Sequence, residues 1–281
     1  MPPTEKRIAE LELIAAKLRL HAVTIAHRLG EDRKCHPGPA LSIADIIAVL
    51  YFETLRMDPA RPDWPDRDRF VLSKGHACPI LYAALAMKGF FREEALWTLR
   101  HVNSMLQGHP DMTKTPGIDM TAGSLGHGLS LAAGIALAGR HIDKRPYRVY
   151  ALLGDGELQE GLVWEAAMAA ANFGLDNLVA VVDCNDWQSS KSVPVSKLMS
   201  VQPLRGKWES FNWFVEEIDG HDVAQIVGAF AQAQKNRGRP TVILATTVKG
   251  KGVSFMENNN SWHQKAPTDA ELESARRQLL S

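Results

Sequence analysis

Several short segments of the chain are apolar throughout, and segments with a helical pattern separate them. The clearest are 148–153 (RVYALL), 178–183 (LVAVVD) and 240–248 (PTVILATTV), and 70–72 (FVL) is a shorter candidate. Strands that are apolar along their whole length and alternate with helices are typical of a parallel sheet covered on both faces. The pattern therefore predicts an α/β fold in which a parallel sheet carries helices on both faces.

Apolar residues at helical spacing predict helices over 5–29, 42–55, 77–89, 92–102, 126–142 and 158–173. Ser42 with Asp45, and Thr268 with Glu271, have the spacing of a capping box, so each pair predicts a helix start. The second pair opens a terminal helix over about 268–281. Pro37-Gly38-Pro39 predicts a loop, and 250–267 predicts an irregular, mobile active-site loop. We expect residues 1–281 to form one domain.

The composition excludes several classes of protein. The chain has 281 residues, 45% of them hydrophobic, and its 32 basic residues balance 32 acidic ones, so neither nucleic acid nor a membrane surface is an expected partner. The charged N-terminal segment lacks the apolar core of a signal peptide, and no apolar run has the length of a membrane span. Cys35, Cys78 and Cys184 have neither disulfide nor zinc spacing, which favours a cytoplasmic location.

Two oxygen-bearing side chains follow consecutive predicted strands. Gly154-Asp155-Gly156 comes after 148–153, and Asn185 comes after 178–183. The carboxyl ends of parallel strands form the ligand-binding edge of such a sheet, so Asp155 and Asn185 should lie close together. Their oxygens suit Mg²⁺, Ca²⁺ or Mn²⁺ rather than zinc, and the glycines before a helix N-terminus allow phosphates to approach. The alternative is a plain strand–helix turn in which Asp155 only caps the helix.

At this point the chain resembles the transketolase family, whose metal motif matches GDGELQEG at 154–161 and NDW at 185–187. The resemblance implies the thiamine diphosphate-binding fold of the PP type, with thiamine diphosphate and a divalent metal as cofactors. It also implies that Asp155, Asn185 and the main-chain carbonyl of Trp187 bind the metal. Gly154, Gly156 and Glu157 then belong to the cofactor-binding segment, and Glu160 helps to connect two active sites across a dimer.

Four histidine motifs extend this resemblance over about residues 10 to 267. They are CHPG at 35–38, DRFVLSKGH at 68–76, QGHP at 107–110 and SWH at 261–263. By resemblance, His36 and His109 face the substrate, while His76 and His263 also contact the diphosphate. Cys35 stands where the family has a smaller residue. The alternative for any one of them is an ordinary loop histidine, so the argument depends on all four meeting in space.

Two further motifs concern the cofactor. GSLGHG at 123–128 matches the turn that lies against the thiamine ring, which assigns Gly123, Ser124 and Leu125 to the cofactor site. The family often has Gln at the position of His127, and we assign His127 no role. Lys249 would place positive charge near the phosphates, although a solvated loop lysine is the more common outcome.

The resemblance also implies an activity and a partner. Transketolases transfer a two-carbon ketol unit from a ketose or ketose phosphate to an aldose or aldehyde acceptor. In this family a Glu on a second, pyrimidine-binding domain activates the cofactor, and we find no such domain in this chain. We therefore expect the N-terminal subunit of a split transketolase. A separate C-terminal subunit would carry the pyrimidine-binding domain, and the assembly would contain two copies of each chain.

Three alternatives stay open at this stage. The first is another thiamine diphosphate enzyme subunit, similar to deoxyxylulose-phosphate synthase or to a 2-oxoacid dehydrogenase. The HPG element at 36–38 and the GHP element at 108–110 favour transketolase over both. The second is a non-catalytic cofactor-binding homologue, and the third is an α/β metal-binding protein that does not use thiamine.

Overall fold

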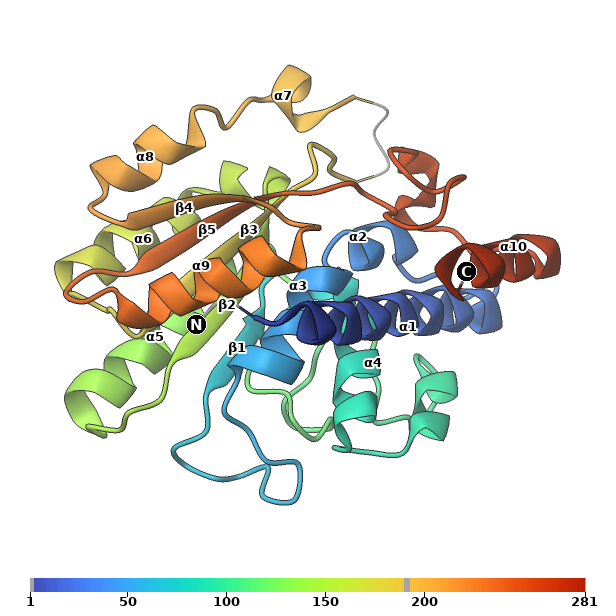
Figure 1. The fold of residues 1–281 in the computed structure, drawn as a ribbon, viewed down its shortest axis with the longest axis horizontal. Helices are drawn as coiled ribbons and strands as arrows, with labels where there is room; N and C mark the ends of the chain where they lie inside the picture. The colour runs from blue at the N-terminus through green and yellow to red at the C-terminus, as the bar shows by residue number, and fades with distance from the viewer. Residues whose placement is uncertain (1–2, 190–192, 281) are drawn as a thin grey trace.

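The computed structural model describes residues 3–189 and 193–280, and its centre is one parallel sheet (Figure 1). The strands are β1 (Arg69–Leu72), β2 (Val149–Gly154), β3 (Leu178–Cys184), β4 (Phe214–Asp219) and β5 (Thr241–Thr246). Their order is β1-β2-β3-β5-β4, and every neighbouring pair is parallel. The predicted α/β fold with a parallel sheet is therefore confirmed.

Helices cover both faces of the sheet. One face carries α1 (Glu5–Leu29), α3 (Ala44–Val49), α4 (Cys78–Lys88) and α9 (Val223–Lys235), and the other carries α5 (His127–Leu137), α6 (Gly161–Asn172) and α8 (Leu204–Ser210). Successive strand residues alternate between the two cores: Tyr150 and Leu152 pack on the first side, while Ala151 and Leu153 pack on the second. This alternation explains why the strands are apolar along their whole length.

The region predicted as a Pro37-Gly38-Pro39 loop is instead the short helix α2 (Pro37–Leu41). Proline fits the first turn of a helix because that turn leaves its N–H groups without helical partners. The capping box predicted at Ser42 and Asp45 is also wrong. Helix α3 begins at Ala44 without a side-chain cap. The Ser42 hydroxyl donates to Pro39 O and to Asp183, and Asp45 accepts from Arg19.

Other boundaries differ in detail. The helix predicted over 92–102 is a 3₁₀ helix, η3 (Glu93–Thr98), and the one predicted over 158–173 begins with a separate 3₁₀ turn, η5 (Gly156–Gln159). Helix α3 continues into the π-helical turn η1 (Leu50–Thr54), and α5 continues into η4 (Ala138–Ile142). The sequence patterns led to no expectation for β4 and α9. Strand β4 lies at the sheet edge and is only partly buried, so it lacks the apolar run of the others.

The C-terminal part closes over the carboxyl ends of the strands. Thr268 and Glu271 exchange the two hydrogen bonds of a capping box at the start of α10 (Asp269–Leu280), which confirms that prediction. The segment 250–267 is irregular apart from η6 (Asn260–His263), as expected, but it buries Met256 and Trp262. Its mobility stays a prediction. In the described part of the chain, no helix has the length and apolar character needed to cross a membrane.

Candidate cofactor and substrate site

A pocket lies at the edge of the sheet where β2 and β3 end. Twelve of the predicted site residues line it: His36, His76, Gly123, Leu125, Gly154, Asp155, Gly156, Glu157, Asn185, Trp187, Lys249 and His263. They come from seven separate stretches of the chain. The fold therefore brings most of the predicted site together, and the pocket also includes Pro39, Lys74, Gln188 and Ser189.

Asp155 and Asn185 lie next to each other because β2 and β3 are neighbours in parallel register. The Asp155 carboxylate accepts hydrogen bonds from Gly156 N at 2.7 Å and Asp186 N at 2.6 Å. Burial and the nearby Asp183 raise the pKa of Asp155 to about 7. A carboxyl group in this position gains stability from a bound cation, because the cation favours its charged form. Asn185 Oδ1 accepts from Trp187 N at 3.0 Å, which folds the NDW segment back over the site.

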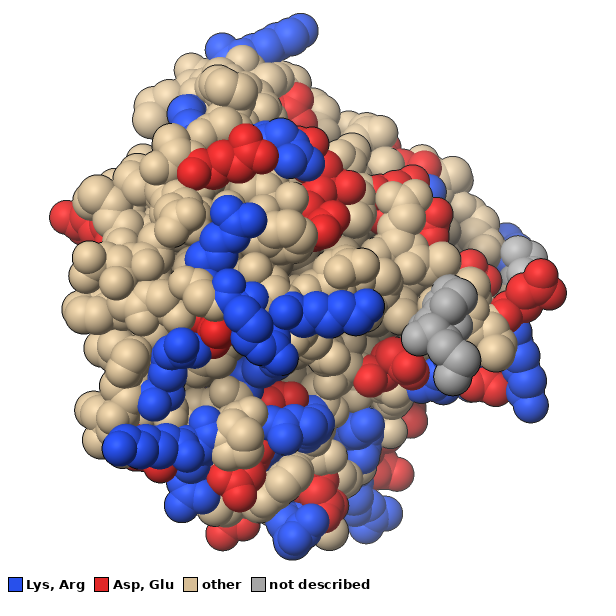
Figure 2. Space-filling view, turned by 60° about the vertical axis from the view of Figure 1, so that its left-hand side comes forward, with Lys and Arg blue, Asp and Glu red and all other residues tan. Residues whose placement is uncertain are grey.

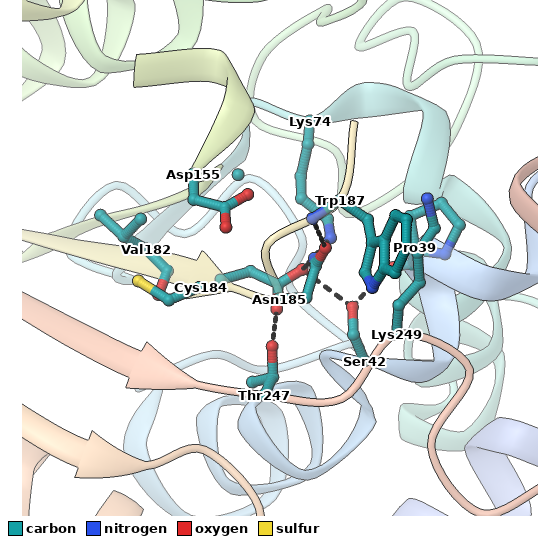
Figure 3. A network of polar contacts seen from close by, with 12 residues as sticks. Pro39, Ser42, Lys74, Asp155, Val182, Cys184, Asn185, Trp187, Thr247 and Lys249 are labelled. Carbon is teal, nitrogen blue, oxygen red and sulfur yellow. Dashed lines mark hydrogen bonds and ion pairs between the residues drawn. The ribbon is translucent and has the colours of Figure 1, made fainter. Parts of the chain in front are cut away.

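Asp183 organises this edge of the sheet, and the sequence interpretation gave it no role. Its buried carboxylate accepts from Ser42 Oγ at 2.8 Å, Lys74 Nζ at 2.5 Å and Asn185 Nδ2 at 2.6 Å, and also from Thr247 Oγ1 (Figure 3). The bond from Asn185 Nδ2 orients that amide so that its oxygen points the other way, as a metal ligand requires. The position of Asp183 two residues before Asn185 on one strand is the signal that could have revealed it.

Two buried lysines supply positive charge. Lys74 is paired with Asp183, and although burial favours the neutral acid, Lys74 holds the pKa of Asp183 below its usual value. Lys249 is fully buried, and its amine contacts Asn260 Oδ1 at 2.5 Å and His263 Nδ1 at 2.9 Å rather than a carboxylate. Burial, together with Lys74, lowers the pKa of Lys249 to about 7. An anion in the pocket would stabilise its charged form.

Three of the four predicted histidines form one cluster. The ring centroids of His36, His76 and His263 lie 5.1 to 5.5 Å apart. Burial lowers the pKa of His36 to about 4 and that of His263 to about 3, with Arg100 and Lys249 as the next causes. Burial and Lys74 lower the pKa of His76 well below its usual value. All three rings are therefore neutral near pH 7 and can accept a proton or donate the one they carry.

His109, Ser124 and Glu160 do not line the pocket. His109 is exposed, but its ring lies beside Gly123, where an added Cβ would meet it at 3.4 Å, and its positive charge would lower the pKa of His36. Glu160 is exposed at the start of α6, and its side chain covers Gly126. The structure therefore brings His109 to the rim of the site and leaves Glu160 facing outward.

Glu157 lines the pocket, and its carboxylate also holds two neighbouring turns together. Its buried carboxylate accepts from Gly126 N at 2.7 Å, from Gly154 N at 3.1 Å and from Ser73 Oγ. These bonds connect the turn at 123–128 to the turn after β2. Gly123 and Leu125 are thereby exposed at the pocket, as a ring-contacting surface would need.

The donor set fits a metal–diphosphate group better than a metal alone. Across residues 3–189 and 193–280, no three His, Cys, Asp or Glu side chains cluster as a metal site. The chain offers one carboxylate, one amide oxygen and one main-chain carbonyl, so phosphate oxygens and water must supply the other ligands of an octahedral ion. Lys249, buried without a carboxylate partner among the described residues, provides a place for the accompanying negative charge.

Comparison with known proteins agrees with this geometry. The family model described as "Transketolase, thiamine diphosphate binding domain" matches residues 12–280. The chain is 47% identical to the 6-deoxy-6-sulfo-D-fructose transketolase subunit SqwG of Clostridium sp. (strain MSTE9) over 234 residues, which is 83% of this chain and 84% of that protein. It is 39% identical to an apulose-4-phosphate transketolase subunit from Phocaeicola vulgatus, covering 97% of this chain and 95% of the relative.

Single-chain transketolases match over a smaller share of their length. Human transketolase is 43% identical over 263 residues, which is 94% of this chain but 41% of the human protein. The structure of transketolase from Leishmania mexicana superposes with a TM-score of 0.88 at 30% identity, covering 96% of this chain and 41% of that one. The chain thus spans about two-fifths of these proteins and most of the two subunit relatives. It belongs to the transketolase family, of which it forms the domain that binds thiamine diphosphate with a divalent metal.

Proposed function

We propose that this chain is the cofactor-binding subunit of a two-chain transketolase, which transfers a two-carbon ketol unit from a ketose to an aldehyde acceptor. The observation that carries the proposal is the cluster of His36, His76 and His263 beside the metal–diphosphate edge of the pocket. A cofactor-binding protein without catalysis would have no need for three neutral, partly buried imidazoles around its ligand.

The residues at the sheet edge would bind and orient the cofactor. Asp155, Asn185 and the Trp187 carbonyl would hold a divalent cation, while Lys249 would face the diphosphate. When bound, thiamine diphosphate supplies the carbon nucleophile of the reaction, and the protein contributes position and electrostatics. The net charge of the occupied site would then be the sum of its carboxylates, lysines, metal ion and diphosphate.

The histidine cluster would manage protons and hydroxyl groups of the sugar. His36 Nδ1 is buried and has no hydrogen-bond partner in the described structure. A buried polar atom of this kind is costly unless a ligand satisfies it, and a sugar hydroxyl would do so. His263 is held by the Lys249 amine at Nδ1, which fixes the orientation of its ring towards the pocket. We assign His109 to the outer rim of the same substrate wall.

The partner subunit would pack on the exposed face of α5 and α6. This face has a hollow lined mainly by small and apolar residues: Ser130, Ala133, Gly134, Leu137, Ala166, Ala169, Ala170, Phe173 and Leu175. Met168 is 51% and Phe173 is 48% exposed there, which is typical of a surface that another chain covers. Trp164, also on α6, stacks on Phe211 and lies tilted against Trp208, so it packs within this chain.

Assembly into two copies of each chain would allow Glu160 to connect two active sites. Its carboxylate is exposed at the start of α6, beside the α5–α6 face, where a second active site across the assembly could be reached. We propose a heterotetramer on this basis, with the activating Glu supplied by the partner. The location we propose is the cytoplasm, where thiols such as the free Cys35, Cys78 and Cys184 stay reduced.

For the substrate we propose an anionic ketose. The names of two subunit relatives specify 6-deoxy-6-sulfo-D-fructose and apulose-4-phosphate, so both proteins act on ketoses that end in a sulfonate or a phosphate. Nothing in the pocket of this chain pairs with such a terminal anion among the described residues that line it, apart from the lysines at the diphosphate end. We expect the partner chain to bind that end of the sugar.

The test is reconstitution. The purified chain, its partner chain and their mixture are assayed with thiamine diphosphate, Mg²⁺, a panel of phosphorylated and sulfonated ketoses, and an aldehyde acceptor. Two-carbon transfer should require both chains. Full transfer by this chain alone would refute the two-chain proposal. A parallel assay of the mixture uses a 2-oxoacid in place of the ketoses, and decarboxylation there without ketol transfer from any ketose would refute the transketolase activity.

A further inference from the structure

A buried chain of polar contacts connects the N-terminal helix to the loop that carries Lys249. Arg19, 7% exposed, donates to the carboxylate of Asp45, 5% exposed, with 3.0 Å between Nη1 and Oδ1. Asp45 Oδ2 contacts His221 Nδ1 at 2.7 Å, and Val248 N donates to His221 Nε2 at 2.8 Å. The chain of contacts lies outside the pocket lining, and none of the motifs that resemble the transketolase family includes it.

Both ring nitrogens of His221 have defined partners. Because Val248 N–H must donate, Nε2 carries no hydrogen, and Nδ1 therefore carries the proton that it donates to Asp45. This is the neutral tautomer, oriented by a carboxylate that is itself held by Arg19. The bond to Asp45 fixes the His221 ring in one orientation, in which Nε2 accepts from the main-chain amide of Val248.

The loop after β4, which carries His221, also contacts the segment after β5, which carries Val248, through other atoms. Gly220 N donates to Thr246 O at 2.8 Å, and a Cβ added at Gly220 would lie 2.5 Å from Thr247 Cγ2. The loop after β4 is therefore packed directly on the segment after β5. Thr247 is held on its other side by Asp183, so residues 246–248 have contacts on both sides.

Lys249 follows immediately, and its placement depends on these contacts. Its amine lies in the pocket between Asn260 and His263, while its main-chain oxygen accepts from Asn258 N at 2.9 Å. Loss of the Val248 anchor would free the main chain one residue before this lysine. We propose that His221 is a positioning residue for cofactor binding: by holding Val248 it fixes Lys249 at the diphosphate end of the site.

Two substitutions of His221 separate this role from a purely structural one. In His221→Asn the side-chain amide can still donate to Asp45 but is too short to reach Val248. In His221→Gln the longer amide places an oxygen where Nε2 accepts from Val248. In the assembled two-chain protein, titration calorimetry with thiamine diphosphate and Mg²⁺ should show about tenfold weaker binding for His221→Asn, and a much smaller loss for His221→Gln. Equal affinities in the two variants would overturn the proposal.

A thermodynamic cycle tests whether the effect passes through Lys249. The double variant His221→Asn with Lys249→Gln should bind thiamine diphosphate little more weakly than Lys249→Gln alone, because the anchored group is already gone. Losses that simply add would show that His221 acts elsewhere and would also overturn the proposal. Gly220→Ala should displace Thr247 and weaken binding as His221→Asn does. It replaces His221→Asn in this test if His221→Asn does not fold.

One control accounts for general destabilisation. Phe230→Leu removes buried volume from α9, which follows the His221 loop, at a ring that packs against Tyr150 of β2. It should lower Tm while leaving the dissociation constant of thiamine diphosphate unchanged. This inference depends on the cofactor assignment, and the outcomes are distinguishable. Absence of binding in the parent protein would refute that assignment, whereas binding in the parent that His221→Asn leaves unchanged would refute the positioning role alone.

Discussion

The histidines show how single residues acquire chemistry from their surroundings. His36, His76 and His263 are ordinary imidazoles on three loops, but burial beside two lysines keeps them neutral at pH 7. A neutral imidazole can both accept and donate a proton, which suits alkoxide and hydroxyl chemistry. Their function thus depends on the electrostatics of the pocket as much as on their identity.

Replacing His76 or His263 with Ala should lower the rate of two-carbon transfer at least about tenfold, the low end of general acid–base effects. Steady-state assays of the reconstituted enzyme measure this change, with circular dichroism as a check of folding. His127→Ala is the matched control, since His127 is exposed outside the pocket lining and should leave the rate unchanged. Unchanged turnover in both test variants would remove these histidines from the mechanism.

The same burial predicts how stability depends on pH. An unfolded histidine takes up a proton below about pH 6.5, whereas the folded chain keeps His36 neutral down to about 4 and His263 down to about 3. At these histidines the unfolded state then binds more protons, so their contribution to the free energy of unfolding falls as pH is lowered through this interval. Asp155, whose pKa is raised to about 7, contributes in the opposite direction, but it is one group against several histidines.

We therefore expect the Tm of the cofactor-free chain to decrease by several degrees between about pH 7 and pH 5. His263→Gln removes one of the titrating groups, so its Tm should decrease less over the same interval. Scanning calorimetry at several pH values compares the two slopes. A slope as steep in His263→Gln as in the parent would contradict the assignment of this pH dependence to His263.

At the scale of elements, the sequence was sufficient to predict a helix or strand where one physical signal dominated. Fully apolar strands identified the parallel sheet, and the Thr268–Glu271 spacing identified the start of α10. The prediction of a capping box at Ser42 and Asp45 was wrong, because both side chains bond to residues far away in sequence. Ser42 donates to Asp183, and Asp45 contacts Arg19 and His221. Local spacing cannot distinguish these outcomes, because the partners lie far away in sequence.

The sequence predicted most of the residues that line the candidate pocket, but not the residues that hold them in place. Motifs identified Asp155, Asn185 and the histidines, whereas Asp183 and His221 act only through contacts that the fold creates. Strand β4 and its following loop escaped prediction because an edge strand with a mixed polar pattern gives a weak signal. The residues missed in this way position other groups rather than contact the ligand.

Helix α2 is packed so closely that its glycine cannot be replaced without movement. A Cβ at Gly38 would lie 2.8 Å from Trp262 O and 3.3 Å from Lys249 Cε. Gly38→Ala should therefore lower the free energy of unfolding by about 1–3 kcal/mol and weaken thiamine diphosphate binding, as the 250–267 segment is displaced. Urea unfolding and titration calorimetry measure the two effects.

Gly228, in the middle of α9, is the matched control. An added Cβ there meets nothing within 4 Å, so Gly228→Ala should stabilise the chain by about 0.5–1 kcal/mol through helix propensity alone. If Gly38→Ala proved equally harmless, the tight contact between α2 and the 250–267 segment would be wrong.

At the scale of the molecule, two surface hollows have different linings, one basic and one apolar. The side where the strands begin carries many Lys and Arg side chains (Figure 2), and Arg140, Lys144, Arg145, Arg148 and Arg237 line a hollow there. Several of these have structural partners: Arg140 pairs with Asp176, and Arg148 donates to main-chain carbonyls at the end of α9. Positive groups near the C-terminal end of a helix are favourable by themselves. The apolar α5–α6 face is the surface on which we propose that the partner chain packs.

A charged residue on that face should prevent assembly without unfolding the chain. Ala169 is exposed on α6 and lines the hollow. Ala169→Arg should leave Tm of the isolated chain nearly unchanged but abolish the heterotetramer in analytical ultracentrifugation, because an unpaired charge would be buried in the interface. Gln232→Arg, at an exposed position of α9, is the control that should assemble normally. Assembly of Ala169→Arg with full activity would place the interface elsewhere.

The central claim is that the edge formed by β2 and β3 binds a metal and thiamine diphosphate as one unit. Titration calorimetry of the assembled two-chain protein with thiamine diphosphate tests it most directly, with Mg²⁺ present or removed by chelation, in the parent and in Asp155→Ala. We expect binding that requires Mg²⁺ in the parent and is weakened by at least about 100-fold in Asp155→Ala, because loss of an outer-shell partner of a metal site already costs about 10- to 100-fold and Asp155 is the proposed direct ligand. Tight binding that is independent of Mg²⁺ and unchanged by the substitution would contradict it.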